Sequence, residues 1–297
     1  MPLYIRSLPC KSKNPIVEQN SIPEGTDLYN PSRSGKHLYI RVTKRSATTF
    51  LNSAIIYNID QKVSRDITSP WNLLKPSLNL FKGIEDLRIV EWVGKVWFAG
   101  TCTHASDHMV NDLIVGHFDT ELSRVEKCCA VDIGSLPVKN VCPFVYENKL
   151  CLLDFGLMQI YELGFNEDEP KIYISKKLDI GWGAGLDKHA ESKLRGSTSP
   201  VHLHGNLWGC VVHDIIFNQA KSLVTRLSYI HHWVEFDMST RQVTFVSTPF
   251  WIAHWGIEYV SGIHFDKATN SVSLYFGVAD HLPMQCETTL SNLRTGY

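Results

Sequence analysis

The sequence lacks long hydrophobic runs, and it shows little of the periodicity of amphipathic helices. No apolar run approaches the roughly 18 residues that a membrane-spanning helix needs. The N-terminal stretch has no long apolar core, so we expect no signal peptide. Charge is also balanced, with a formal net charge of −1, which argues against a nucleic-acid footprint or a polybasic membrane patch. We therefore expect no nucleic-acid partner and no membrane span.

Paired cysteine motifs are absent as well. The eight cysteines are scattered, none forms C-x-x-C, and several lie inside apolar, strand-like runs. There is also no N-x-[ST] sequon with a permitted middle residue. Scattered cysteines of this kind predict free, buried thiols in a reducing compartment. We therefore expect a cytoplasmic protein.

Common signatures of nucleotide, nucleophile and metal sites are missing too. The chain has no Walker loop, no G-x-S-x-G elbow and no Cys/His nucleophile arrangement. The glycines of residues 180–194 do not make a G-x-G-x-x-G pattern after a strand. His231 and His232 would face opposite sides of a strand, and His202 with His204 lacks an evident third ligand, so we expect no zinc site. Instead of zinc, the protein could use a divalent cation held by carboxylates and a diphosphate, but such a site has no sequence signature here.

Short alternating apolar runs, joined by polar turns, recur along the chain. The turn residues recur roughly every 55 to 65 positions; they are Gly35, Gly94, Asn148, Gly205 and Asn270. Five such hairpin units without intervening helices predict an all-β fold, a five-bladed β-propeller, with a β-sandwich as the runner-up. We expect one domain over residues 1–297, with blades at about 28–80, 84–135, 138–180, 195–250 and 256–290.

Polar residues recur where each predicted blade begins. Others lie at the ends of strands that are expected to be the innermost of a blade. In a propeller such positions converge on the central channel, although each residue alone also fits a structural ion pair or a turn cap. The blade openings contribute Asn30, Arg41, Glu85, Asp86, Arg88, Lys139, Asn140, Arg195, Ser197, Glu258 and Tyr259. The strand ends contribute His213, Asp214 and Asp280. Their recurrence at equivalent places in the repeat favours one shared site.

Three stretches resemble motifs of the β-1,2-mannoside phosphorylases, in the family's order. "GIEDLR" resembles Gly-x-Glu-Asp-Pro-Arg. "RGSTSPVHLHGNLWGCVVHDI" is similar to a segment in which a small-residue and proline loop precedes a Gly-Trp strand ending in Tyr-His-Gly. "SLYFGVADH" resembles Tyr-Tyr-Gly-Ala-Ala-Asp. The relatives of this family include mannosyltransferases on the same five-bladed scaffold, so the resemblance implies a sugar-active propeller.

A closer likeness is to propeller domains attached to bacterial glycosyltransferases, and it covers roughly residues 28 to 288. It rests on several short motifs in order: Asn30-Pro31-Ser32, Lys139 to Phe144, Val212-His213-Asp214, Ile257-Glu258-Tyr259 and Phe276 to Asp280. This likeness implies a nucleotide sugar and a glycan acceptor as substrates. A separate glycosyltransferase is the protein partner that it implies.

The departures from the phosphorylase pattern bear on the reaction. Leu87 replaces the proline, and Val212 replaces the tyrosine before the histidine. The stretch 103–113, where the phosphorylases place extra basic residues for inorganic phosphate, contains no Arg or Lys. This weakens phosphorolysis and leaves glycosyl transfer or hydrolysis. We therefore favour an inverting glycosyltransferase, with a hydrolase or phosphorylase acting on short oligosaccharides and a non-catalytic carbohydrate-binding propeller as alternatives.

Inverting transfer needs one base, and a nucleotide leaving group needs charge stabilisation rather than an acid. Glu85 and Asp86 are neighbours that would point to opposite sides of an extended segment, so they cannot form a hydrolase's carboxylate pair. One would face the channel, and the other would brace the backbone or pair with Arg88. By the resemblance, Asp86 is the first catalytic candidate, ahead of Asp280 and Glu258. Residues that could give positive charge to a diphosphate are Arg88, Arg195, Lys139 and His213.

Overall fold

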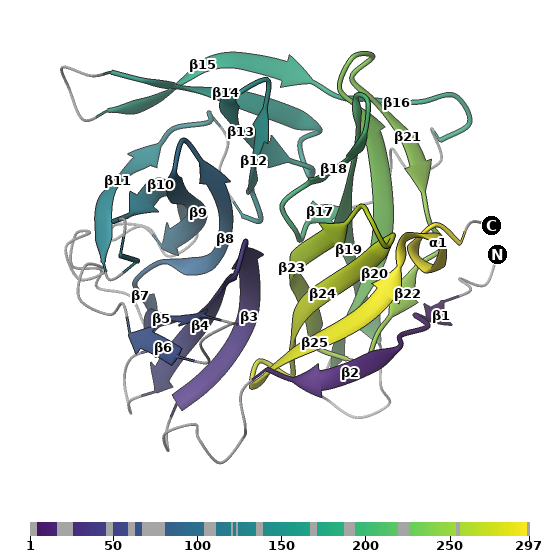
Figure 1. Ribbon diagram of the computed structural model, residues 1–297, viewed down its shortest axis with the longest axis horizontal. Coiled ribbons are helices and arrows are strands. Elements are labelled where there is room, and N and C mark those ends of the chain that lie inside the picture. The colour runs from purple at the N-terminus through teal and green to yellow at the C-terminus, as the bar shows by residue number, and fades with distance from the viewer. Residues whose placement is uncertain are drawn as a thin grey trace.

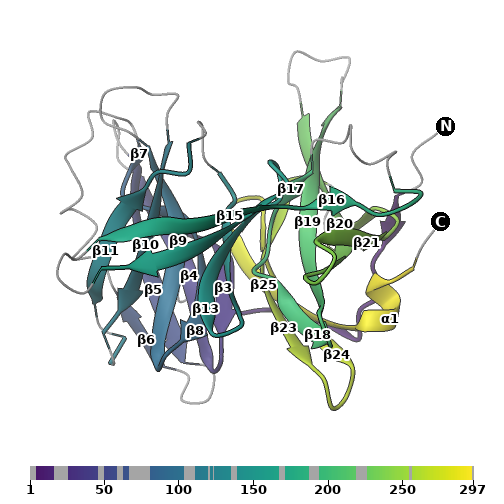
Figure 2. The ribbon, with the colours of Figure 1, turned by 90° about the horizontal axis from the view of Figure 1, so that it is seen from above.

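The protein forms five sheets that lie around a central axis (Figure 1), so the predicted all-β, five-bladed propeller is confirmed. Figure 2 shows the first two sheets on one side of the molecule and the last two on the other. The computed structural model describes residues 5–16, 26–45, 50–58, 63–66, 81–103, 111–119, 121–122, 124–134, 139–166, 171–186, 194–218, 226–253 and 256–295.

The first three sheets are built mainly from four consecutive antiparallel strands. The first sheet contains β3 (Thr26–Ser34), β4 (His37–Arg45), β5 (Phe50–Asn58) and β6 (Val63–Asp66), with β7 (Phe81–Lys82) paired to β5. The second contains β8 (Glu85–Trp92), β9 (Lys95–Thr103), β10 (Asn111–Phe118) and β11 (Val125–Val131). The third contains β12 (Cys142–Tyr146), β13 (Lys149–Asp154), β14 (Gln159–Phe165) and β15 (Ile172–Asp179).

The last two sheets borrow strands from elsewhere in the chain. The fourth contains β17 (Arg195–Gly196), β18 (Val201–His204), β19 (Leu207–Asn218), β20 (Arg226–Asp237), β21 (Gln242–Val246) and β22 (Phe250–Trp251), joined by β1 (Arg6–Ser7) and β16 (Gly181–Trp182). The fifth contains β23 (Glu258–Asp266), β24 (Ser271–Val278), β25 (Leu282–Thr289) and β2 (Ser12–Pro15). The helix α1 (Leu290–Leu293) follows β25. The ring is thus closed by pairing β2 with the last strand of the chain.

The five turn residues that the sequence predicts all lie in the hairpin between the first and second long strands of a sheet. Each has a positive φ between 52° and 69°, a conformation that glycine and asparagine adopt most readily. The residues are Gly35, Gly94, Asn148, Gly205 and Asn270. The recurrence in the sequence therefore reflects a turn whose backbone needs these residue types.

The hydrophobic core is divided among the interfaces between neighbouring sheets. One cluster joins Tyr39 of the first sheet to Phe98 of the second, and another joins Trp97 of the second to Tyr161 of the third. Further clusters lie between the third and fourth sheets and between the fourth and fifth. Because the apolar side chains are used in these interfaces, the polar strand starts at the axis are left to form a site. No helix in the part of the chain described here is long and apolar enough to cross a bilayer.

Candidate functional site

A cavity of about 220 Å³ lies at the axis and receives side chains from all five sheets. Its lining residues are Asn30, Arg41, Asp86, Lys139, Asn140, Arg195, His213, Ile215, Tyr229, Tyr259 and Asp280. All but Ile215 and Tyr229 are candidates that the sequence indicated, brought together from segments far apart in the chain. Their catalytic and binding roles stay predictions.

Four of the lining residues have left-handed backbone although none is glycine. Asn30, Asp86, Asn140 and Asp280 have φ values of 49°, 52°, 62° and 51°. Asn and Asp tolerate this region better than other residues with a Cβ. In β3 and β8 the residue sits at a shift in strand register, between Tyr29 and Ser32 and at the equivalent place in β8. The bulge turns the polar side chain toward the axis.

An ion pair between buried Arg41 and partly exposed Asp86 lies on the floor of the cavity. The Arg41 Nη1 donates to Asp86 Oδ1 at 2.8 Å, and the Asn30 amide donates to the same oxygen at 2.6 Å. Arg41 is held from behind by Asn52 Oδ1, which accepts from its Nε at 3.0 Å and its Nη2 at 2.8 Å. The Asn30 Oδ1 is buried and has no hydrogen-bond partner among the residues that the structure describes. The floor therefore presents a fixed carboxylate that can accept a hydrogen bond from a ligand hydroxyl.

The pKa values of the two neighbouring carboxylates are shifted in opposite directions. Burial opposes ionisation of Asp86, but the Arg41 and Arg88 guanidiniums and the Asn30 amide outweigh it and hold its pKa at about 2. Burial raises the pKa of Glu85, against the attraction of Arg41. Asp86 therefore carries a negative charge at neutral pH among these neighbours.

The expectation that Glu85 and Asp86 point to opposite sides is wrong. Because β8 is bulged between Glu85 and Arg88, the segment is not regularly extended, and both carboxylates reach one guanidinium. Arg41 Nη2 lies 3.5 Å from Glu85 Oε1, while Nη1 contacts Asp86. Glu85 does not line the cavity; it supports Arg41 and accepts from the Asn52 amide at 3.3 Å.

Arg88 lies beneath the cavity and does not line it. Its side chain is fully buried, and its Nε donates to the Ser197 carbonyl at 2.6 Å. The two terminal nitrogens donate to the backbone carbonyl of Asp86 and to the Tyr259 hydroxyl. Arg88 therefore pairs with the Asp86 carbonyl rather than with its carboxylate, and it cannot reach a ligand in the cavity.

One wall of the cavity is aromatic. The His213 ring packs edge-on to Tyr229 and Tyr259, with centroids 5.5 and 5.0 Å away. Ser197 is buried behind the imidazole, with its Oγ 2.9 Å from His213 Nδ1. Burial and the nearby His231 and arginines lower the pKa of His213 well below its usual value, so the ring is neutral. His213 and Ser197 therefore contribute shape and hydrogen bonding, while the positive charge predicted for His213 is absent at neutral pH.

Lys139 and Arg195 supply cations at the opening. Both side chains are exposed and line the cavity, and neither has a carboxylate partner within the described ranges. Arg41, by contrast, is neutralised by Asp86 and Glu85. The two exposed cations can therefore bind an anionic ligand without first breaking an ion pair.

Glu258 and Asp214 are not part of the cavity, because strand alternation turns them away from it. Glu258 is fully buried, and its two oxygens accept from the backbone N–H groups of Ile252 and Ala253 at 2.7 and 2.6 Å. Its neighbour Tyr259 faces the site instead. Asp214 accepts from the adjacent Ile215 N–H at 2.7 Å. Glu258 therefore acts in the structure as a buried hydrogen-bond acceptor, and the structure places it outside the cavity in which a catalytic role was predicted for it.

Ile215 and Tyr229 are lining residues that the sequence did not indicate. They are directly opposite each other in the pairing of β19 with β20. Ile215 lies two residues beyond His213, so alternation along β19 could have identified it. Tyr229 could not be identified in that way, because the register between the two strands is not encoded in either strand alone.

The histidines considered as metal ligands have other neighbours. His231 Nε2 lies 3.0 Å from the Glu258 carbonyl, and His232 Nδ1 lies 3.2 Å from the Ser247 carbonyl. His202 Nε2 is 2.8 Å from the Gly205 carbonyl. Among the described residues, no three His, Cys, Asp or Glu side chains cluster as metal ligands. Residues 104–110, where we noted the lack of basic residues, and 187–193 of the glycine-containing loop lie outside the described residues.

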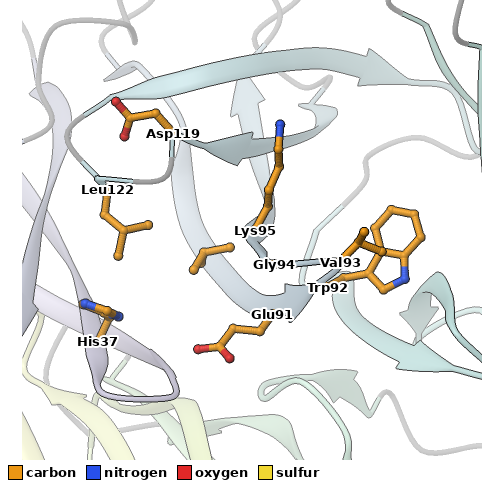
Figure 3. A pocket seen from close by; sticks show the side chains of 9 residues that line it. His37, Glu91, Trp92, Val93, Gly94, Lys95, Asp119 and Leu122 are labelled. Carbon is orange, nitrogen blue, oxygen red and sulfur yellow. The ribbon is translucent and has the colours of Figure 1, made fainter.

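A second hollow, of about 350 Å³, lies at the other end of β8 from Asp86 (Figure 3). It is lined by residues at strand ends and turns of the first two sheets, including His37, Glu91 and Asp119. In Figure 3 the Trp92 ring points away from this hollow, since it stacks on Phe165 at 5.1 Å. Because only two sheets contribute to it, the axial cavity is the better candidate for a functional site.

No family model and no curated protein matches the chain, but solved structures do. The mannosyltransferase MPT-1 from Leishmania mexicana, described as GDP-Man-dependent, has a TM-score of 0.60 at 14% identity, over 92% of this chain and 89% of its own. The mannose phosphorylase MPT-4 from the same organism has a TM-score of 0.57 at 13% identity, covering 90% and 85%.

A third similar structure comes from work on the GH130 family of mannoside phosphorylases, which is said to contain glycoside hydrolases that target β-1,2-mannosidic linkages in Candida mannan. It has a TM-score of 0.54 at 11% identity, over 92% of this chain and 87% of its own. At these identities the comparisons show the fold alone. The resemblance that the sequence motifs indicated is confirmed as a structural resemblance to GH130-type phosphorylases and mannosyltransferases.

Proposed function

We propose that the protein is a carbohydrate-active enzyme that transfers a glycosyl group from a nucleotide sugar to a glycan acceptor. The observation that carries this proposal is the pairing of a fixed anion with unneutralised cations in one cavity. Asp86 is held ionised, while Lys139 and Arg195 line the same cavity without a carboxylate partner in the described ranges. A leaving diphosphate needs such cations and needs no acid.

The shape of the cavity supports a small glycosyl group. Its volume of about 220 Å³ is below the roughly 300–1,000 Å³ of sites for drug-sized ligands, so it suits one sugar ring. Asp86 would accept hydrogen bonds from sugar hydroxyls on the floor. The Asp86 charge would also stabilise the positive charge that develops at the anomeric carbon.

Asp280 is the candidate base for the acceptor hydroxyl. It lines the cavity and is exposed, so an acceptor glycan could approach it from solvent. In the proposed reaction its carboxylate takes the hydroxyl proton while the acceptor oxygen attacks the anomeric carbon and the nucleoside diphosphate departs. Such proton transfer typically contributes roughly 10²–10⁴-fold to the rate.

Phosphorolysis is the second candidate, because Lys139 and Arg195 would also hold inorganic phosphate. The ionised state of Asp86 counts against it, since the phosphorylases that the motifs resemble use an aspartate at this position as an acid. The similar structures include both a mannosyltransferase and a mannose phosphorylase, which is why the two reactions need a direct comparison.

The test offers the protein a panel of nucleotide sugars, with mannose donors first, and separately β-mannosides with inorganic phosphate. We expect release of nucleoside diphosphate in the first arm and no sugar 1-phosphate in the second. Asp86→Asn should lower turnover by at least about 100-fold while retaining donor binding. Normal sugar binding by wild type and variant, without turnover in any arm, would instead indicate a binding propeller.

The cations are tested by binding of a nucleoside diphosphate measured calorimetrically. Lys139→Ala and Arg195→Ala should each weaken binding by about tenfold, since each removes a charge-assisted contact. Lys176→Ala, which removes an exposed lysine on β15, is the matched control and should leave binding unchanged. Equal affinities in all four proteins would overturn the assignment of the diphosphate to these two residues.

A further inference from the structure

Polar contacts connect the first and fifth sheets, which are neighbours in the ring (Figure 1). The Arg33 guanidinium donates to the Tyr275 hydroxyl, and the Ser261 hydroxyl donates to the Pro31 carbonyl at 3.0 Å. The apolar clusters that span the other four sheet interfaces have no counterpart here among the described residues, although Ile16 after β2 packs against the small cluster of the first sheet. Side-chain hydrogen bonds therefore help to set how the fifth sheet sits against the first.

A turn between β24 and β25 brings Asp280 to the cavity. The His281 N–H closes this turn by donating to the Val278 carbonyl at 3.1 Å. Both residues inside it, Ala279 and Asp280, have left-handed backbone, with φ values of 53° and 51°. Glycine, asparagine and aspartate adopt this conformation most readily, whereas the Cβ of alanine makes it unfavourable. The turn therefore needs support from other segments to keep this conformation.

Hydrogen bonds to other segments supply this support. The Ala279 N–H donates to the Ile257 carbonyl, just before β23, at 2.7 Å. The His281 Nδ1 lies 2.9 Å from Asp27 Oδ1 of β3, and the imidazole is the donor because an ionised carboxylate can only accept. The Asp27 side chain is only 12% exposed, so the first sheet fixes its position. His281 thereby ties the turn that carries Asp280 to the first sheet.

Close packing restricts the strand that leads into the turn. Gly277, near the end of β24, has so little space that a Cβ built on it would lie 3.0 Å from Asn30 Oδ1 and 3.1 Å from the Asn30 nitrogen. Asn30 in turn donates to Asp86 at 2.6 Å. A shift of β24 toward the first sheet would therefore push against the floor of the cavity, and a shift away from it would break the hydrogen bond from His281 to Asp27.

We propose that His281 is a positioning residue, which holds the Asp280 carboxylate in place through its hydrogen bond to Asp27. This role rests on the proposed function, in which Asp280 takes the proton of the acceptor hydroxyl. Such a transfer needs the two oxygens within about 2.6–3.2 Å of each other, and a misplacement of about 1 Å can cost roughly 100-fold in rate. His281 is half exposed and does not line the cavity, so it acts through Asp280 and not on the substrate.

Amide hydrogen exchange of the full-length protein, measured residue by residue by NMR, tests whether His281 fixes the turn. His281→Ala should speed exchange of the amides at positions 279 and 281 by at least about tenfold, because both hydrogen bonds depend on the conformation of the turn. His281→Asn should retain the wild-type protection, since its side-chain amide can donate from nearly the position of Nδ1. His204→Ala removes an exposed histidine of β18 and is the matched control. Equal exchange in wild type and His281→Ala would overturn the proposal.

Turnover of a nucleotide sugar provides the second measurement. His281→Ala should lower kcat by about tenfold, while the affinity for a nucleoside diphosphate stays unchanged because Lys139 and Arg195 are intact. His281→Asn should restore most of the kcat. Asp27→Ala should cause a similar loss, and combining it with His281→Ala should add little, because the two substitutions remove one contact.

The outcomes separate this role from the proposed function. A wild-type kcat in His281→Ala, or the same loss in His281→Asn, would show that the hydrogen bond does not position Asp280. Wild-type protein that turns over no nucleotide sugar would count against the proposed function, and the exchange measurement would still decide whether His281 fixes the turn.

Discussion

Asp86 shows how a single side chain can be fixed in one charge state by its neighbours. Its carboxylate is only partly shielded, with 26% of the side chain exposed, yet Arg41 and Asn30 both donate to one of its oxygens. The left-handed backbone of the bulge places it there. A carboxylate held in this way stabilises a developing positive charge without any rearrangement when the reaction takes place.

The ionisation of Asp86 predicts a pH-dependent contribution to stability. Its pKa is lowered from 3.8 to about 2 in the folded protein. The contribution is therefore fully present above the unfolded pKa of about 4, and it is lost as the pH falls through the folded pKa. The shift corresponds to about 2 kcal/mol. Asp86→Asn should thus lower the free energy of unfolding by about 2 kcal/mol at pH 7 but by only about 1 kcal/mol at pH 3.

Urea unfolding of wild type and Asp86→Asn between pH 7 and pH 3 checks this prediction. Asp132→Asn, which removes an exposed carboxylate, reports the general effect of losing one negative charge. A difference between wild type and Asp86→Asn that stays constant across this pH range would show that the Asp86 carboxylate is not held ionised by its neighbours.

Most of the polar residues at the axis could be predicted because they recur at the same place in each repeat. Asn30, Asp86 and Asn140 share one backbone conformation for this reason. The role of Glu258 could not be predicted in the same way. It also stands at a strand start, but the sequence does not reveal that the Ile252 and Ala253 N–H groups turn back toward it.

At the scale of elements, close approaches between strands bring the cavity residues together. Gly196 ends β17 directly after Arg195, and a Cβ built on it would lie 2.4 Å from the Asn140 carbonyl oxygen. No side chain fits at that distance, so glycine allows the fourth sheet to approach the segment before β12. Arg195 and Asn140 can thereby line the same cavity.

Gly196→Ala should separate these two segments. Because the obstructing atom belongs to the backbone, we expect a loss of about 1–3 kcal/mol in the free energy of unfolding and weaker binding of a nucleoside diphosphate. Gly181→Ala in β16 is the control, since a Cβ there would meet no atom closer than 3.9 Å. Chemical denaturation and calorimetry give the two readouts. Equal stability of the two variants would show that the close approach is not required.

The strands of each blade could be predicted from alternation and turn residues, but the partners between distant segments could not. The main examples are four short strands that pair with a sheet formed by another part of the chain, namely β1, β2, β7 and β16. Each of these strands is two to four residues long, too short to show periodicity. Their pairing is decided by which sheet edge lies nearby in the folded ring, and that depends on the positions of all five sheets.

At the scale of the whole molecule, Arg88 connects three sheets at the axis. From β8 of the second sheet it donates to the Ser197 carbonyl beside the fourth sheet and to the Tyr259 hydroxyl of the fifth. Tyr259 in turn donates to Asn140 Oδ1 at 2.8 Å, next to the third sheet. A planar guanidinium spreads its donors over three nitrogens and can reach three separated acceptors, whereas the three N–H bonds of a lysine ammonium all start from one nitrogen and cannot span the same positions.

Arg88→Lys should therefore destabilise the whole ring rather than one blade. The variant keeps a buried charge but leaves at least one of the three acceptors without a donor, which we expect to cost about 3 kcal/mol and to lower the Tm by roughly 5–10 °C in one cooperative transition. Arg124→Lys is the matched control, because that side chain is 73% exposed and its replacement should leave the Tm unchanged. Calorimetry distinguishes the outcomes: if Arg88→Lys unfolded at the wild-type Tm, or in separate steps, the sheets would be held together by their apolar interfaces and not by this guanidinium.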